Sequence, residues 1–387
     1  MEESSLAQAK ENLSNEMENT IPINPKVLKW AREECGYTPS EIANKLHVPL
    51  AVYSRWETIG EGIELPQLVD LSRICKRQIA FFFLPNVPER TIRPTDFRNL
   101  ELSTTRISDK TLLAFRRTEK FRDFLIETNG LEYYKYQYSW IHTYRNLFPN
   151  ISYNIDNNSR YIRDLLEFPV EEQLSIKLRT EDSYNRWKNS IEQHLGIYVF
   201  QFSMPDHEVQ GFSYSDSYPY CIGINNSYSV TSRTFTLFHE LAHILNSQSG
   251  LCKHDDIIST HDNETEYNCN NFAGYLLVPS EKIVNVSDKD QIYAYATSFK
   301  ISSEVYLRRL FSLGYLSEEA FFSLLYQIRL AVIPTQPHYV KSQVKRSINS
   351  RGISLFNSAV DAMNNKKISY SQTADILGIK INHILNY

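Results

Sequence analysis

The sequence predicts an α+β protein that is predominantly helical and carries one small sheet. Apolar residues recur at helical spacing along most of the 387-residue chain, whereas the strand patterns lie between residues 197 and 225. Near the N-terminus, short helical patterns are joined by a tight turn, which is typical of a helix-turn-helix. At roughly 150 residues per domain, a chain of this length holds two or three domains.

Composition excludes several classes of protein. Hydrophobic residues make up 42% of the chain and charged residues 22%, as in globular proteins. The net charge of −4 argues against a protein that coats nucleic acid by bulk charge. The longest notable apolar run, Ile79 to Leu84, is far shorter than the roughly 20 residues of a membrane-spanning helix. The polar N-terminus has no secretory signal, and the five scattered cysteines form no C-x-x-C, so we expect a cytoplasmic protein without a disulfide framework.

The first 90 residues divide into a polar tail and a helical domain. Residues 1–22 lack an apolar stripe and are expected to be disordered, and residues 23–90 are expected to form a helix-turn-helix domain. Thr38 and Glu41 form a capping box at the start of a helix over residues 39–46. Small Ala43 lies where this helix would cross the next one.

The next helix, residues 49–57, would be the recognition helix of this domain. It offers Tyr53, Ser54 and Arg55 for contact with duplex DNA, whereas Val52 and Trp56 are expected in the core. Residues 25–80 hold eight Lys and Arg against seven Asp and Glu, a weak basis for phosphate binding. Two interpretations stay open: a DNA-binding module through residues 23–90, or a module that docks another protein or a second copy of the chain.

The rest of the chain is divided by its patterns into three regions. Residues 91–180 read as a helical connector without a catalytic motif, residues 181–315 hold strands and the chemical motif, and residues 316–387 read as helical. Residues 369–387 are similar to a helix-turn-helix fragment, although a terminal helical cap is the favoured interpretation. No internal repeat was found.

The most informative motif is H-E-x-x-H at residues 239–243. Residues four apart lie on one face of a helix, so His239 and His243 can bind one Zn²⁺. Glu240 lies beside the first histidine, where it can act as a base on a water rather than coordinate the metal. Chance alone would supply roughly 0.02 such motifs in a chain of this composition.

A catalytic zinc site needs a third protein ligand. The extended motif H-E-x-x-H-x-x-G-x-x-H is excluded by Asn246 and Ser249. Glu266 is the favoured ligand, because it opens an amphipathic helix on which Asn270, one turn later, can bond a zinc-bound histidine. Glu264 and a histidine stay open as alternatives. The acidic and histidine residues that follow the motif are His254, Asp255, Asp256, His261, Asp262, Glu264 and Glu266.

Two stretches together resemble a known family. RTFTLFHELAHIL, followed by ETEYNCNNFAGYLLVP, resembles the ImmA/IrrE family of bacterial and phage metallopeptidases. The resemblance implies a compact zincin-like domain that binds one zinc ion per chain through His239, His243 and Glu266, with Glu240 as catalytic base. Cys269 stands where the family commonly has alanine.

The N-terminal segment resembles the Xre-type helix-turn-helix fused to many members of that family. Thr95-Asp96-Phe97-Arg98 resembles the D-F-R that follows this module in the family. The resemblance implies a zinc endopeptidase whose substrate is a regulatory protein, such as a repressor. A DNA-binding regulator, or an antitoxin-like partner of a neighbouring-gene toxin, is the alternative.

Overall fold

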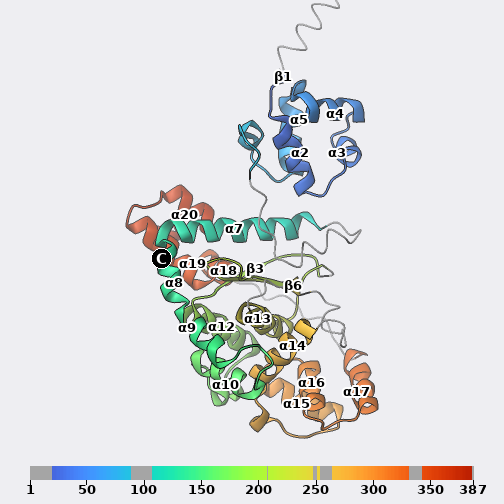
Figure 1. The fold of residues 1–387 in the computed structure, drawn as a ribbon, viewed down its shortest axis with the longest axis vertical. Coiled ribbons are helices and arrows are strands. Elements are labelled where there is room, and N and C mark those ends of the chain that lie inside the picture. Colours follow the sequence, from blue (N-terminus) through green and yellow to red (C-terminus); the bar gives the residue numbers. More distant parts are fainter. Residues whose placement is uncertain are drawn as a thin grey trace, which may run out of the picture. The chain divides into compact units, whose positions relative to one another are not determined.

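The computed structural model describes residues 20–88, 107–206, 208–246, 251–252, 264–330 and 342–385, without the side chains of residues 251–252. The chain divides into two compact units, residues 1–92 with 105–113, and residues 93–104 with 114–387 (Figure 1). The described residues are mostly helical, as predicted, and they hold two small sheets where the sequence predicted one. The D-F-R at residues 96–98 and most of the tail at residues 1–22 lie outside them. Among the described residues, no helix has both the length and the apolar character needed to cross a bilayer.

The first unit is a small helical bundle. Its elements are β1 (Thr20–Ile21), α2 (Pro25–Glu34), α3 (Pro39–Lys45), α4 (Leu50–Ile59), β2 (Ile63–Glu64), α5 (Leu65–Ile74) and the 3₁₀ helix η1 (Ile79–Phe83). β1 pairs antiparallel with β2, so Thr20 and Ile21 belong to the fold and not to the predicted tail. The capping box of Thr38 and Glu41 is present, as predicted. Whether this unit is a DNA-binding helix-turn-helix domain stays a prediction.

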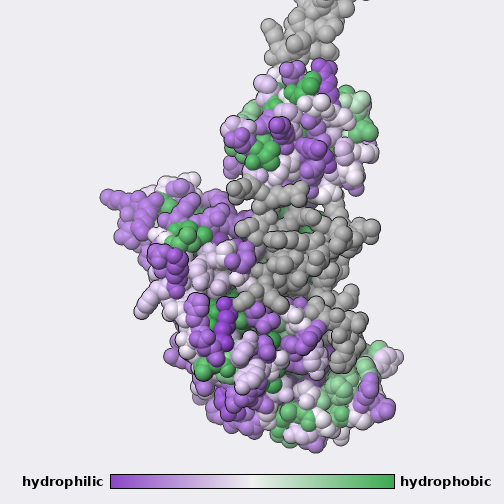
Figure 2. Space-filling view, in the orientation of Figure 1, coloured by the Kyte–Doolittle hydropathy of each residue, from purple (hydrophilic) through white to green (hydrophobic). Residues whose placement is uncertain are grey.

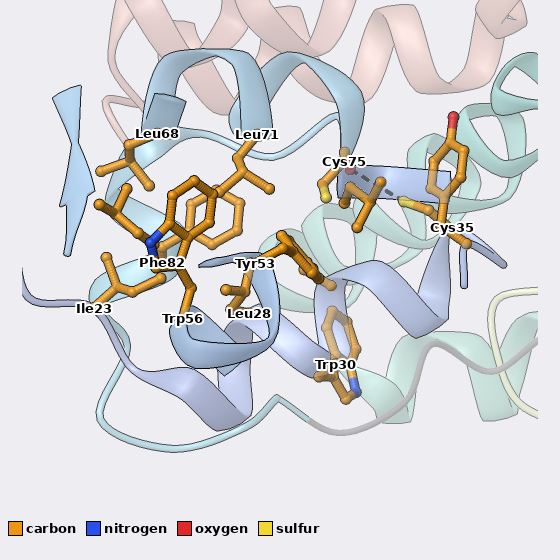
Figure 3. Packing of buried hydrophobic residues seen from close by; sticks show 14 of the residues in the cluster. Ile23, Leu28, Trp30, Cys35, Tyr53, Trp56, Leu68, Leu71, Cys75 and Phe82 are labelled. Carbon is orange, nitrogen blue, oxygen red and sulfur yellow. Dashed lines mark hydrogen bonds between the residues drawn. The ribbon is translucent and has the colours of Figure 1, made fainter. Parts of the chain in front are cut away.

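The core of this unit corrects the prediction for α4. Tyr53 is fully buried beside Trp56, and its hydroxyl donates a hydrogen bond of 2.7 Å to Glu57 (Figure 3). Val52, which was expected in the core, is 39% exposed. The apolar face therefore runs through residues 53 and 56, three apart, because the larger Tyr53 ring fills the space between α2 and α5. Tyr53 is not placed to contact DNA.

The second unit begins with helices that the sequence assigns to a connector. They are α7 (Asp109–Asn129), which starts in the first unit, α8 (Leu131–Gln137), α9 (Ser139–Leu147), α10 (Ile155–Leu165) and α11 (Val170–Leu174). α12 (Thr180–Ser190), with its π-helical end η2 (Ile191–Leu195), follows at the start of the predicted region 181–315. The predicted regions 91–180, 181–315 and 316–387 lie within this one unit, apart from the few residues near the start of α7.

A four-stranded sheet lies at the centre of the second unit. Its strands are β3 (Tyr198–Phe202), β4 (Gly211–Tyr214), β5 (Cys221–Asn225) and β6 (Leu251–Cys252), in the order β3-β5-β4-β6. β3 and β5 are parallel, and β4 is antiparallel to both of its neighbours. The first three strands are buried throughout, because helices cover both faces (Figure 1).

Different helices cover the two faces of this sheet. On one face, α7 packs through Phe115 against Phe212 of β4, with ring centroids 4.8 Å apart. α13 (Val230–Leu245) lies on the other face. α14 (Glu264–Leu277) is the next helix along the chain, and it packs against α13. The remaining elements are η3 (Ser280–Lys282), α15 (Lys289–Phe299), α16 (Ser303–Ser312), α17 (Glu318–Leu330), α18 (Gln343–Arg351), α19 (Ile353–Asn364), α20 (Tyr370–Leu377) and α21 (Ile381–Leu385).

Two buried charged residues attach the C-terminal helices to the edge of the sheet. Lys188 donates to the backbone oxygen of Asn349 at 2.9 Å, and Glu192 accepts from the backbone nitrogens of Val199 and Ser354. Burial raises the pKa of the Glu192 carboxyl and lowers that of the Lys188 ammonium, because each group loses hydration. These bonds hold α18 and the start of α19 against β3.

Candidate metal centre

α13 carries the H-E-x-x-H motif and is buried along most of its length. Ser229 caps its N-terminus by accepting a hydrogen bond from the backbone nitrogen of Ser232. Every residue from 234 to 245 is buried, since the helix lies between the sheet and other helices. At its C-terminus, Arg145 donates to the backbone oxygens of Ile244 and Leu245, which places a positive charge at the negative end of the helix dipole.

Glycine at position 211 sets the distance between α13 and the sheet. A Cβ atom at Gly211 would lie 2.5 Å from Cγ2 of Thr236 and 3.2 Å from Cγ of Glu240. The first contact is closer than real Cβ atoms approach other carbons and the second is tight, so a side chain at this position would require Thr236 or α13 to move. The glycine thereby brings Glu240 of α13 close to strand β4.

α14 brings a carboxylate to the two histidines. Nε2 of His239 and Nε2 of His243 lie 3.0 Å apart, and Glu266 has its oxygens 3.1 Å and 3.3 Å from these two nitrogens. All three side chains are buried. With bonds of about 2.0–2.1 Å, neighbouring ligands of a tetrahedral zinc ion lie roughly 3.3 Å apart. The observed distances therefore fit three ligands of one metal ion.

The tautomer of His239 also fits metal binding. Its Nδ1 lies 2.8 Å from Oδ1 of Asn270, and an amide oxygen only accepts hydrogen bonds. Nδ1 therefore carries the proton, and Nε2 presents its lone pair to His243 and Glu266. A lone pair directed at other acceptors in a buried site is stable only when a cation or a proton lies between them.

Charge in the site favours a cation as well. Burial raises the pKa of Glu266, but His239 and His243 lower it by more, so the carboxyl stays ionised well below its usual range. Burial lowers the pKa of His243, but Cys269 and Glu266 raise it by more. A buried carboxylate that depends on neighbouring positive charge is an appropriate ligand for a divalent ion.

Glu240 is buried on α13, the helix that also carries the two histidines. Neither of its carboxylate oxygens has a hydrogen-bond partner of standard geometry among the described residues. Burial raises the pKa of Glu240 more than His243, His239 and nearby Ser213 lower it. A buried carboxylate without a partner costs stability, and such groups gather at functional sites.

The residues that the sequence predicts for the metal site come together. His239, Glu240, His243, Glu266 and Asn270 lie in one cluster. Glu264 is exposed at the start of α14. The other open candidates for the third ligand, between residues 254 and 262, lie outside the described residues.

Sequence reasoning missed the supports of the site. Gly211 and Ser213 on β4 and Arg145 on α9 lie far from the motif in sequence, and no local pattern marks them. Cys269 was noted only as a replacement for alanine, yet its buried thiol influences His243.

Comparison with known proteins agrees with this geometry. Residues 192–311 match the family model of the IrrE N-terminal-like domain, Peptidase_M78. This match supports the ImmA/IrrE family for that part of the chain. The IrrE-like segment starts at the π-helical end of α12, includes the whole metal cluster and ends in α16, whereas the first unit lies outside it. A search of curated proteins and a search of solved structures each found no match.

Proposed function

We propose that this chain is a zinc-dependent endopeptidase that cleaves a regulatory protein. The observation that carries the proposal is the placement of Glu240, buried and without a hydrogen bond of standard geometry, on the same helix as two histidines that meet Glu266 at 3.1 and 3.3 Å. The match of residues 192–311 to a peptidase family supports a function of this class. One zinc ion per chain would be held by His239, His243 and Glu266.

Each residue of the cluster has a distinct role in this proposal. Bound zinc supplies a Lewis acid that polarises a peptide carbonyl and acidifies water. Glu240 takes the proton from the attacking water and passes it to the leaving amine. Asn270 holds the ring of His239 so that Nε2 stays unprotonated. Zinc is favoured over magnesium or calcium because two imidazoles and one carboxylate form a nitrogen-rich set.

The substrate we propose is a repressor or the product of a neighbouring toxin gene. The alternative function is a DNA-binding transcriptional regulator or antitoxin-like partner, in which the peptidase fold serves mainly for binding. On α4, Ser54 and Arg55 are exposed and keep DNA contact open. Leu50, Val52 and Ile59 are also exposed on that helix, which favours protein docking, including to a second copy of the chain.

We further propose that the protein acts in the cytoplasm. Cys221 and Cys269 are buried free thiols, which supports a reducing compartment.

Metal analysis tests the proposed site. We expect the purified chain to carry about one zinc ion, because three ligands from two helices form a catalytic-type site. His239→Ala and His243→Ala should each lose most of that zinc, whereas His142→Ala, at an exposed position on α9, should keep it. Full zinc retention in both of the first two variants would exclude the site.

A further inference from the structure

The helices at the C-terminal end repeat the local structure of α3 and α4. Thr38 and Glu41 form the capping box of α3, and Ser369 and Gln372 form the same capping box at the start of α20. The two pairs are separated by the same number of residues along the chain, 331. The sequence pointed to a helix-turn-helix fragment at residues 369–387, and the structure shows that its first helix starts with the same capping box as α3.

The turns that follow these two helices also correspond. His47 has φ 54° and Gly378 has φ 59°. These two residues are also 331 positions apart, like the two capping boxes. In both turns, the backbone nitrogen of the next residue donates to the helix before it, to the oxygen of Ala43 at 3.0 Å and of Ala374 at 3.2 Å. A helix, a short turn with a left-handed residue and a second helix form a helix-turn-helix.

This geometry alone does not define a binding surface. The turn between α15 and α16 has the same form: Lys300 has φ 61°, and the nitrogen of Ile301 donates to the oxygen of Ala296 at 3.0 Å. However, half of the residues of α16 are buried among its neighbours, with Tyr306 and Leu310 fully enclosed. Only the exposed surface of a helix-turn-helix decides whether it binds a partner.

The C-terminal module, residues 342–385, has a basic exposed surface. It holds six Lys and Arg against two Asp and no Glu, whereas residues 25–80 hold eight against seven. One of the two aspartates, Asp375, forms an ion pair with Lys120 of α7. Figure 2 shows that the face over α20 is mostly hydrophilic. The exposed side chains that can contact a nucleic acid are Lys345, Lys366, Lys367, Lys380, Asn382 and His383.

We propose that residues 342–385 bind duplex DNA. Lys366 lies before α20 and Lys380 lies in the turn between α20 and α21, where both lysines contact phosphates on the DNA backbone. Asn382, exposed on α21, has the amide group that pairs with the edge of adenine in the major groove. Because α18 is bonded to the edge of the central sheet, this module would bring DNA to the unit that contains the metal cluster.

Binding of the full chain to labelled random-sequence duplexes of about 20 base pairs, two helical turns, tests the proposal. At about 50 mM salt, we expect binding that weakens steeply with added salt. The double variant Lys366→Ala/Lys380→Ala should bind at least about tenfold more weakly and reduce the salt slope by about 2, because two phosphate contacts are lost. Its zinc content should match that of the unmodified chain, which checks that the fold is intact.

Matched variants separate this module from other sources of binding. Lys26→Ala/Lys177→Ala removes the same charge at exposed positions elsewhere and should bind normally, as should Arg55→Ala on α4. Asn382→Ala should keep affinity for random duplexes but lose the sequence preference obtained by selection. Three results would overturn the proposal: no binding at about 50 mM salt, equal loss in the charge-matched control, or loss in Arg55→Ala alone.

Discussion

Asn270 accepts a hydrogen bond of 2.8 Å from Nδ1 of His239, across the contact between α14 and α13. Glu266 lies one turn earlier on α14 and approaches Nε2 of the same ring at 3.1 Å. One helix thus holds both nitrogens of His239, the first through an amide and the second through a carboxylate. This arrangement fixes the ring orientation before any metal binds.

Removal of this amide should weaken metal binding without removing a ligand. We expect Asn270→Ala to lower zinc affinity by about 10- to 100-fold, the range for partners that orient a ligand. Asn270→Asp keeps an acceptor for Nδ1 and should retain more of the affinity. Competition with a chelator of known affinity measures both variants, and unchanged affinity in Asn270→Ala would show that the bond does not orient His239.

The third ligand can be separated from its neighbour in sequence. Glu266→Ala should lose most of the zinc, because it leaves two ligands in a buried site. Glu264→Ala is a matched control, since Glu264 is exposed only two residues away and should not affect zinc. Zinc content by mass spectrometry of the native protein distinguishes them, and the opposite result would assign the ligand to Glu264.

We expect that even a methyl side chain at position 211 lowers the stability of the protein. Gly211→Ala places a methyl group 2.5 Å from Thr236 and 3.2 Å from Glu240, so α13 must move away from the sheet. We expect a loss of about 1–3 kcal/mol in the free energy of unfolding, as for other overpacked sites, together with reduced cleavage. Thr236→Ser removes the nearer methyl group and should restore part of the stability in the double variant. Denaturant unfolding measures this, and a fully stable Gly211→Ala would mean that the close approach is not required.

The sequence predicted those parts of the site that depend on local spacing. His239 and His243 are four apart, as are Glu266 and Asn270, and helical periodicity alone places each pair on one face. On α4, Trp56 is buried as predicted, but Tyr53 and not Val52 is buried beside it, because packing against other helices, and not local pattern, decides this position. Gly211 could not be predicted, since its role depends on a helix that begins 19 residues later.

Acid should release a contact between α16 and α17. Burial alone would raise the pKa of Glu304, but Arg329 and Arg308 lower it by more, below its ordinary value of 4.5. A carboxyl with a depressed pKa contributes stability that is fully present above its unfolded value and is lost as pH falls through the folded value. Glu304→Gln should therefore melt about 2 °C lower at pH 7, with the difference disappearing towards pH 3. Thermal unfolding of both proteins at each pH measures this, and a difference independent of pH would exclude an ionic contribution.

The central claim is that Glu240 performs chemistry and is not a metal ligand. Glu240→Gln preserves the size of the side chain but cannot accept a proton near neutral pH. Cleavage of the neighbouring repressor or toxin, followed by mass spectrometry, should fall at least about 10²-fold, while zinc content and folding stay unchanged. If Glu240→Gln cleaves at the native rate, or keeps the full biological phenotype without cleavage, proteolysis is not the function and the peptidase fold serves as a binding surface.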